Sequence, residues 1–414
     1  MSAAGAGPGV DPARVIADVR SLETLSSGPD GARRVCWTQG WREAREMFAG
    51  LLDEIGLAFE VDEAGNAWTH IEGEDAAAPA LALGSHLDSV PNGGWLDGPL
   101  GVMAGLGVLR AWAGADGKPP RGLVLVDWAD EEGAFGRSLL GSSAATGTLD
   151  PSELDALRDL DGRPATEALA ENGVDPARML DAGGRLEGIG DYLELHIEQG
   201  PVLTERGAAA AAVSGCAGLE RFLLRFSGRA SHAGTTPMDT RSDAGLAAMA
   251  TALQVEGIAT AAGGVGTTGS ISFEPGGMTV IPGAAELSVD IRHPEAGPLA
   301  SMLESVLDAA EGEARSRGCE LERENVWRIE PIAFDPELVD LAERCCGDVT
   351  GEPIRMASGA LHDAAEVARR LPAAMVFSSS LEGVSHSPRE DTDEADLAAA
   401  IEAFGLLANR RLPA

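Results

Sequence analysis

The residues of this 414-residue chain that could do chemistry are histidines and carboxylates at turns and at the ends of short apolar segments. Imidazole nitrogen and carboxylate oxygen together suit borderline divalent metals, and one carboxylate can bridge two ions about 3.5–4 Å apart. The candidate ligands are His86, Asp97, an acidic residue of the run 130–132, His196 and His386. This set predicts a two-metal site.

Residues beside these candidates suit supporting roles. Asp88 lies two residues after His86, where it could orient the imidazole ring. The adjacent Glu131 and Glu132 suit one metal ligand beside one general base. Any one of these residues is as well explained as part of a surface loop. The whole set is not, because its members end separate segments of the chain.

The elements that must position these residues are short apolar strands alternating with helices. Short strands are expected at 80–84, which is fully apolar, and at 123–126, 192–196 and 373–377, and helical spacing is expected at 41–52, 101–113 and 394–410. Continuous apolar strands separated by helices indicate an α/β sheet covered on both faces. Such sheets place their sites at the carboxyl ends of the strands, where the candidate ligands lie.

The pattern changes in the middle of the chain. Strands are expected at 222–226, 270–273, 286–292 and 320–327, and helices at 243–260 and 299–315. The order β-α-β-β-α-β is that of a ferredoxin-like domain. The prediction is a mixed-sheet α/β catalytic domain formed by 1–213 and 331–414, with the ferredoxin-like domain inserted at 214–330.

Composition excludes several classes of protein. The net charge of −35 argues against a nucleic-acid partner, which requires clustered Lys and Arg. The five cysteines are odd in number and lack CxxC spacing, as expected of reduced residues in a cytoplasmic protein. No basic leader precedes an apolar stretch, and no run of about 18 uninterrupted apolar residues predicts a membrane span.

Six segments, in order along nearly the whole chain, resemble the M20 metallopeptidase superfamily. Within it they are most similar to the branch of N-carbamoyl-L-amino acid hydrolases, β-ureidopropionases and allantoate amidohydrolases. The segments are Gly-Ser-His-Leu-Asp-Ser-Val (84–90), Asn-Gly-Gly-Trp-Leu-Asp-Gly-Pro-Leu-Gly-Val (92–102), Glu-Leu-His-Ile-Glu-Gln-Gly-Pro (194–201), Ser-His-Ala-Gly-Thr-Thr-Pro-Met (231–238), Val-Ile-Pro-Gly (280–283) and Gly-Val-Ser-His-Ser-Pro (383–388).

The resemblance implies two divalent ions per subunit, zinc or manganese, with cobalt or nickel as alternatives. One ion would be held by His86 and His196 and the other by Glu132 and His386. Asp97 would bridge the two ions. Glu131 would act as the general base that activates water and later protonates the leaving amine.

The resemblance also implies residues that handle a small carboxylate substrate. His232, otherwise a turn histidine, would stabilise the oxyanion in the site of a partner subunit, which requires a homodimer formed through the inserted lid domain. Arg292, otherwise a solvated cation on a polar strand face, would clamp the substrate carboxylate. Gln199 would bind the ureido group, and His362 would contact the substrate.

Three departures from the family pattern bear on specificity. Thr279 stands where the family has asparagine, and Leu361 stands where it has glycine. The segment after Glu132 is one residue short and lacks the expected arginine. The metal-binding positions are kept and some substrate-facing positions are not, which predicts a retained reaction on a shifted substrate.

The leading functional hypothesis is hydrolysis of an N-carbamoyl-L-amino acid to the amino acid, carbon dioxide and ammonia. The alternatives are hydrolysis of allantoate or another ureido acid, and N-acyl-amino-acid deacylase or exopeptidase activity. A non-catalytic binding protein is disfavoured because Glu131 and all five ligand positions are present.

Overall fold

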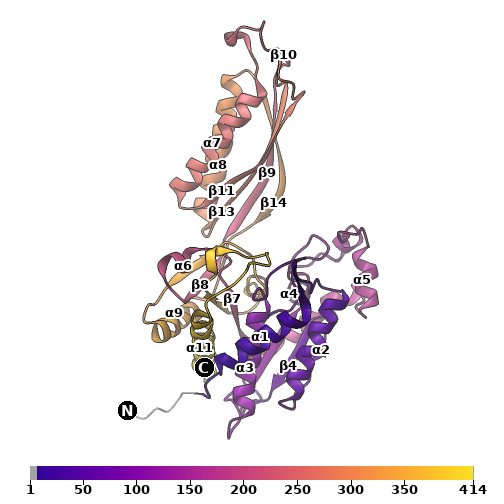
Figure 1. The fold of residues 1–414 in the computed structure, drawn as a ribbon, viewed down its shortest axis with the longest axis vertical. Helices are drawn as coiled ribbons and strands as arrows, with labels where there is room; N and C mark the ends of the chain where they lie inside the picture. The colour runs from indigo at the N-terminus through magenta and orange to yellow at the C-terminus, as the bar shows by residue number, and fades with distance from the viewer. Residues whose placement is uncertain (1–6, 414) are drawn as a thin grey trace. The chain divides into compact units, whose positions relative to one another are not determined.

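The chain divides into two compact units in the computed structural model, which describes residues 7–413 (Figure 1). Unit 1 takes in the chain up to Ser214, then Ala333–Met356, and the chain from Ala360 onward. Unit 2 takes in Gly215–Ile332 and Ala357–Gly359.

Unit 1 is built on a nine-stranded sheet in the order β15-β8-β17-β7-β5-β6-β4-β3, with β16 paired to β8. The strands are β3 (Glu60–Val61), β4 (Ala67–Ile71), β5 (Ala80–His86), β6 (Leu123–Trp128), β7 (Ile189–Ile197), β8 (Ala210–Cys216), β15 (Ile332–Ala333), β16 (Arg355–Ser358) and β17 (Ala373–Ser378). Strands β17, β7, β5 and β6 pair in parallel, whereas β4 and β8 pair antiparallel to their neighbours. The mixed α/β fold expected from the sequence is therefore confirmed.

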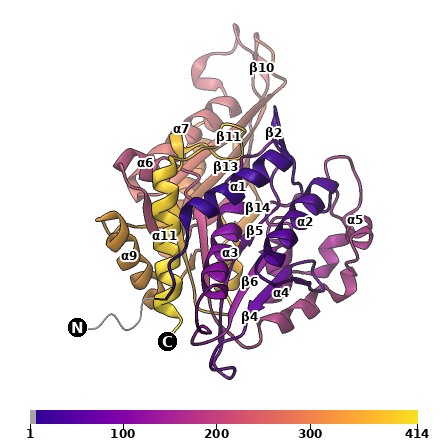
Figure 2. The same cartoon turned by 60° about the horizontal axis from the view of Figure 1, so that its bottom comes forward.

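Helices pack against this sheet. The helices of unit 1 are α1 (Pro12–Ser26), α2 (Gln39–Asp53), α3 (Pro99–Ala113), α4 (Leu140–Thr146), α5 (Ala165–Glu171), α6 (Val202–Arg206), α9 (Pro336–Thr350), α10 (Asp363–Val367) and α11 (Glu394–Arg411). Short 3-10 helices lie at Pro151–Asp155, Pro176–Leu186 and Leu381–Gly383, and a two-stranded sheet joins β1 (Ser27–Gly28) to β2 (Gly31–Ala32). Figure 2 shows α1 beside α3 and α11, and α3 contacts β5, β6 and β7.

The register of β5 and β7 places two candidate ligands side by side. These strands are buried almost throughout because their residues are largely apolar and the sheet is covered. Gly84 of β5 lies opposite Glu194 of β7 in a parallel pair. His86 and His196 each lie two residues further on, so both reach the carboxyl edge of the sheet at the same level.

Unit 2 contains a four-stranded antiparallel sheet in the order β11-β13-β9-β14. Its elements are β9 (Gly218–Ser227), β10 (Ser231–His232), α7 (Ala244–Ala262), β11 (Val265–Glu274), β12 (Val280–Ile281), β13 (Ala284–His293), α8 (Ala296–Ser316) and β14 (Glu320–Ile329), with a 3-10 turn at Met238–Thr240. Apart from the short β10 and β12, which pair with each other, they follow the order β-α-β-β-α-β.

Helix α7 of unit 2 has a length and composition found both in membrane-spanning helices and in core helices. Helix α7 is the one helix among residues 7–413 that is long and apolar enough, by length and composition, to cross a membrane. Its alanines Ala244, Ala247 and Ala248, with Val255, lie in the core that α7 shares with α8 and the sheet. One face of α7 therefore packs in the core of unit 2, and 39% of its apolar window is buried.

Candidate metal centre

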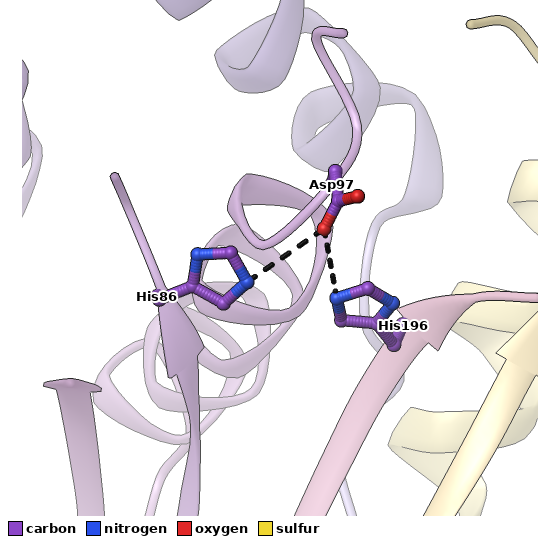
Figure 3. A group of neighbouring side chains, drawn as sticks. All are labelled: His86, Asp97 and His196. Atoms are coloured by element: carbon purple, nitrogen blue, oxygen red, sulfur yellow. Dashed lines mark ion pairs between the residues drawn. The ribbon is translucent and has the colours of Figure 1, made fainter. Parts of the chain in front are cut away.

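The candidate metal site of unit 1 is arranged around Asp97, which lies in the loop before α3. Its Oδ1 atom lies 3.7 Å from Nε2 of His86 and 3.1 Å from Nε2 of His196 (Figure 3). Its Oδ2 atom lies 3.5 Å from Nε2 of His386. Each carboxylate oxygen of Asp97 therefore faces a different group of histidines, which is the arrangement that a bridging carboxylate needs.

Two groups of potential ligands share this carboxylate. His86, Asp97 and His196 form one group, and Asp97, Glu132 and His386 form the other. His386 Nε2 lies 3.3 Å from Glu132 Oε2. The first group is buried, whereas the His386 side chain is half exposed. The structure thus brings together all five residues that the sequence singled out as ligands.

The orientation of the two buried histidines fits a cation. Nδ1 of His86 faces the backbone carbonyl of Asp88 at 3.3 Å, and Nδ1 of His196 faces that of Ile197 at 2.9 Å. These carbonyls place the ring proton on Nδ1, so the Nε2 lone pairs point toward Asp97. Both Nε2 atoms are buried and have no hydrogen-bond partner among the described residues. Lone pairs facing a carboxylate repel it unless a cation lies between them.

The carboxylates around these histidines also favour bound cations. Burial raises the pKa of Asp97, but His196, His86 and His386 outweigh that effect and hold the pKa below its usual value. Burial lowers the pKa of His86, and nearby carboxylates, Glu131 foremost, raise it well above its usual value. A cluster this rich in carboxylate holds its histidines protonated unless metal ions take the place of the protons.

The two acidic neighbours have different surroundings. Glu132 faces His386, whereas Glu131 Oε2 lies 3.7 Å from Nε2 of His86. Burial raises the pKa of Glu131 well above its usual value, the charge of His86 opposes this shift, and Glu132 adds to it. A desolvated carboxylate at the rim of a metal site is placed to exchange a proton.

Asp88 lies behind the site. Its Oδ1 atom is 3.4 Å from Nδ1 of His86, and its Oδ2 accepts a hydrogen bond from the backbone N–H of Glu132 at 3.2 Å. Asp88 therefore contacts one residue from each group of potential ligands.

Gln199 and His362 also lie at this centre. The Gln199 side-chain amide donates to Asp97 Oδ2 at 2.8 Å, while its buried Oε1 has no partner among residues 7–413. The His362 ring packs against His196 with centroids 4.4 Å apart and is buried. Burial, followed by the charge of His196, lowers the pKa of His362 well below its usual value, so the ring is neutral.

Glu390 is a residue of this site that the sequence reasoning missed. Its Oε1 accepts hydrogen bonds from the backbone N–H groups of Leu96, at 2.9 Å, and Asp97, at 3.0 Å. Its Oε2 lies 2.8 Å from the Ser385 hydroxyl, which also lies 2.8 Å from Asp97 Oδ2. Glu390 ties the Asp97 loop to the His386 loop. The signal available in the sequence was a carboxylate four residues after His386.

The remaining candidate residues belong to unit 2. His232 is exposed in β10, and its Nδ1 accepts a hydrogen bond from the backbone N–H of Gly234 at 3.0 Å, which places the ring proton on Nε2. The carbonyl of Thr279 accepts from Ala233 N–H nearby. Arg292 lies at the far end of β13 and contacts Asp290 and Gly359.

These residues are clustered as potential metal ligands, and comparison with known proteins identifies the family. Residues 82–410 match the model of Peptidase family M20/M25/M40. The chain belongs to this family, whose members are metal-dependent hydrolases, and it is an enzyme of the hydrolase class.

Individual relatives are similar over almost their full length. An N-carbamoyl-L-amino acid amidohydrolase of Geobacillus stearothermophilus is 37% identical over 374 residues, covering 90% of this chain and 91% of the relative. An allantoate amidohydrolase of Escherichia coli K12 is 30% identical over 398 residues, covering 93% and 94%. The crystal structure of a hydantoinase/carbamoylase family amidase from Burkholderia multivorans superposes with a TM-score of 0.90 at 30% identity, covering 98% and 99%.

Proposed function

We propose that this protein is a binuclear metal-dependent amidohydrolase that cleaves a linear amide or ureido C–N bond of a small carboxylate substrate. The observation that carries the proposal is Asp97, whose two oxygens face separate groups of ligands. Two divalent ions, zinc or manganese, with cobalt or nickel as alternatives, would supply Lewis acidity for water and for the scissile carbonyl. His86 and His196 would hold one ion, Glu132 and His386 the other, and Asp97 both.

Proton transfer falls to Glu131 in this proposal. Its carboxylate would take a proton from water as the water attacks the carbonyl carbon, and would return that proton to the departing nitrogen. Its place beside His86, the absence of a strong hydrogen-bond donor to it among the described residues, and its raised pKa support this role. Asp88 would hold His86 in the tautomer that keeps Nε2 available.

Substrate recognition would involve four further residues. Arg292 would bind the substrate carboxylate, and Gln199 would bind the ureido group, for which its unpartnered Oε1 is suited. Thr279 and His362 complete the set. His362 is buried against His196, so a contact with substrate requires substrate to reach the floor of the centre.

A homodimer formed through unit 2 is part of the proposal, with unit 2 acting as a ferredoxin-like lid and dimerisation domain. His232 pairs with Val280, before β13 begins at Ala284. Arg292 lies eight residues after Ala284 in the same strand, about 26 Å away. One small substrate cannot touch both residues of one chain, so His232 would have to come from a second copy.

Two features of unit 2 support this assembly. Helix α7 exposes Leu246, Met249 and Leu253, and β11 is an edge strand with unpaired backbone groups on one side. Sedimentation is expected to give a dimer for the wild-type chain and a monomer for Leu253→Glu. A monomeric wild-type protein would contradict the proposal.

The relatives are named for different substrates, so they support more than one substrate for this chain. An N-carbamoyl-L-amino acid is the leading candidate, and release of the amino acid, carbon dioxide and ammonia consumes one water molecule. Allantoate or another ureido acid is the first alternative, and an N-acyl amino acid or a peptide is the second. A cytoplasmic location is part of the proposal, supported by the five free cysteines.

The experiment that tests the proposal is a panel assay of the metal-reconstituted protein. N-carbamoyl-L-amino acids, ureido acids and N-acyl amino acids are offered in parallel, and ammonia and free amine are both measured. Ammonia release from an N-carbamoyl-L-amino acid is the expected result. Release of amine without ammonia, from acyl substrates only, would replace the proposal with deacylase activity.

A further inference from the structure

Asp290 lies between two arginines on the polar face of the sheet of unit 2. Arg221, directly opposite it on β9, donates to Asp290 Oδ2 from Nε at 2.9 Å and from Nη2 at 2.7 Å. Arg292, two residues further along β13, donates from Nε to Oδ1 at 2.8 Å. These three residues carry two positive charges and one negative charge.

The donors of Arg292 are only partly used. A guanidinium carries five N–H groups. Asp290 receives one from Nε and, at 3.4 Å, one from Nη2, and the carbonyl of Gly359 receives one from Nη1 at 2.9 Å. Each terminal nitrogen therefore keeps one N–H without a partner within residues 7–413. The Arg292 side chain is one-third exposed.

The net positive charge around Asp290 is not shared by the rest of this face of the sheet. Four residues away on the same sheet, Arg225 of β9 pairs with Glu286 of β13 and with Glu324 of β14, and this group has a net negative charge. Asp290 alone would neutralise Arg292, and Arg221 restores the net positive charge. An anion approaching this face is therefore attracted to the group around Asp290 and repelled from the group around Arg225.

We infer that Asp290 is the positioning residue of the substrate clamp. It fixes the plane of the Arg292 guanidinium through Nε and Nη2, so that the remaining N–H groups of the terminal nitrogens receive the substrate carboxylate. Arg221 keeps the clamp cationic while Asp290 is paired. The inference rests on the proposed function, because it takes Arg292 as the residue that binds the carboxylate.

The sign of the effect of Asp290→Asn separates positioning from simple charge. If Asp290 merely offset positive charge, its loss would strengthen carboxylate binding and lower KM. If it positions Arg292, its loss frees the guanidinium to rotate, and KM rises about tenfold because oriented, charge-assisted hydrogen bonds are lost. The value of kcat is expected to stay within about twofold, since Asp290 touches no reacting group.

A matched control exists in the same pair of strands. Glu286→Gln removes the equivalent cross-strand ion pair with Arg225 and leaves Arg292 untouched. We expect KM and kcat of this variant to match the wild type. A rise in KM for Glu286→Gln as large as that for Asp290→Asn would overturn the inference, because any loss of an ion pair from the sheet would then produce it.

Arg292→Gln distinguishes failure of the inference from failure of the clamp. If Arg292→Gln raises KM and Asp290→Asn lowers it or leaves it unchanged, Asp290 does not position the clamp. If Arg292→Gln leaves KM unchanged, both the clamp and the inference fail while the reaction stands. Calorimetry also gives the dissociation constant of an N-carbamoyl-L-amino acid for the dialysed full-length wild type and for each variant. The variants can then be compared by dissociation constant instead of KM, and this comparison holds even if the wild type turns over no member of the panel.

Discussion

Asp97, Glu131 and Glu390 show how three carboxylates close together can do different work. Asp97 is surrounded by histidines, and its pKa is held low. Glu131 is desolvated and its pKa is raised. Glu390 is tied to backbone N–H groups and to Ser385, and burial, followed by the charge of Asp97, raises its pKa to about 7. Their surroundings therefore suit Asp97 and Glu131 to the proposed roles of ligand and base, and suit Glu390 to support of the Asp97 loop.

Glu131→Gln tests the role of the base at the residue scale. The amide keeps the shape of the carboxylate but cannot accept the proton of the attacking water, so kcat should fall by at least about 100-fold. Metal content, measured by mass spectrometry, should stay at the wild-type level because Glu131 is not among the proposed ligands. Glu167→Gln on exposed α5 serves as the control. Activity near that of the control would show that another group acts as base.

At the scale of elements, the apolar strands were predictable and the loops were not. The runs that became β5, β6 and β17 are largely apolar, and β7 has apolar residues around Asp191, Glu194 and His196. Elements of this kind are buried wherever the sheet forms. Because sites of open sheets lie at strand ends, the sequence also predicted which candidate ligands meet.

Contacts between distant loops could not be predicted in the same way. Glu390 meets the Asp97 loop across almost 300 residues of chain, and the Gln199 amide turns toward Asp97. Such contacts depend on loop conformations with positive φ, as at Gln199 and His386, which no periodic pattern of side chains encodes. The contact between Arg292 and Asp290 is easier to predict from the sequence, because strand alternation places both residues on the polar face of β13.

Substitution of Gly98 tests the turn that brings Asp97 close to the histidines. Its φ is +84°, and a Cβ atom there would lie 2.4 Å from the ring of His86. Gly98→Ala should therefore lose metal affinity and stability through strain and overlap together. Gly136→Ala is the matched control, because its φ is +82° but nothing lies within 4 Å of its Cβ position. That variant should lose only the conformational part, about 1–2 kcal/mol. Equal losses of metal affinity would contradict the overlap with His86.

At the scale of the whole molecule, Asp191 ties the end of the chain to the central sheet. This buried residue of β7 accepts hydrogen bonds from Arg121, at 2.6 Å, and from Arg411 of the last helix, at 2.7 Å and 3.0 Å. Burial raises the pKa of Asp191, but Arg411 and Arg121 outweigh that effect and hold the pKa below its usual value.

Asp191→Asn should lower the free energy of unfolding by about 3 kcal/mol near neutral pH, because two arginines lose their charged partner. A carboxyl whose pKa is lowered by folding contributes stability above its unfolded pKa, about 3.9, and that contribution disappears as pH falls. The gap between wild type and variant in urea unfolding should therefore stay constant from pH 7 to about pH 5 and shrink as the pH falls below the unfolded pKa toward the lower folded pKa. A gap independent of pH would show that packing, not charge, accounts for the loss.

The claim that two ions share Asp97 is tested most directly by metal titration of the dialysed protein, with stoichiometry read by calorimetry and mass spectrometry. We expect two equivalents of zinc or manganese per chain for the wild type. We expect one equivalent for His386→Ala, which leaves His86 and His196 intact, and weakened binding of both ions for Asp97→Ala. A single equivalent in the wild type, or two tight equivalents in Asp97→Ala, would show that two ions do not share Asp97.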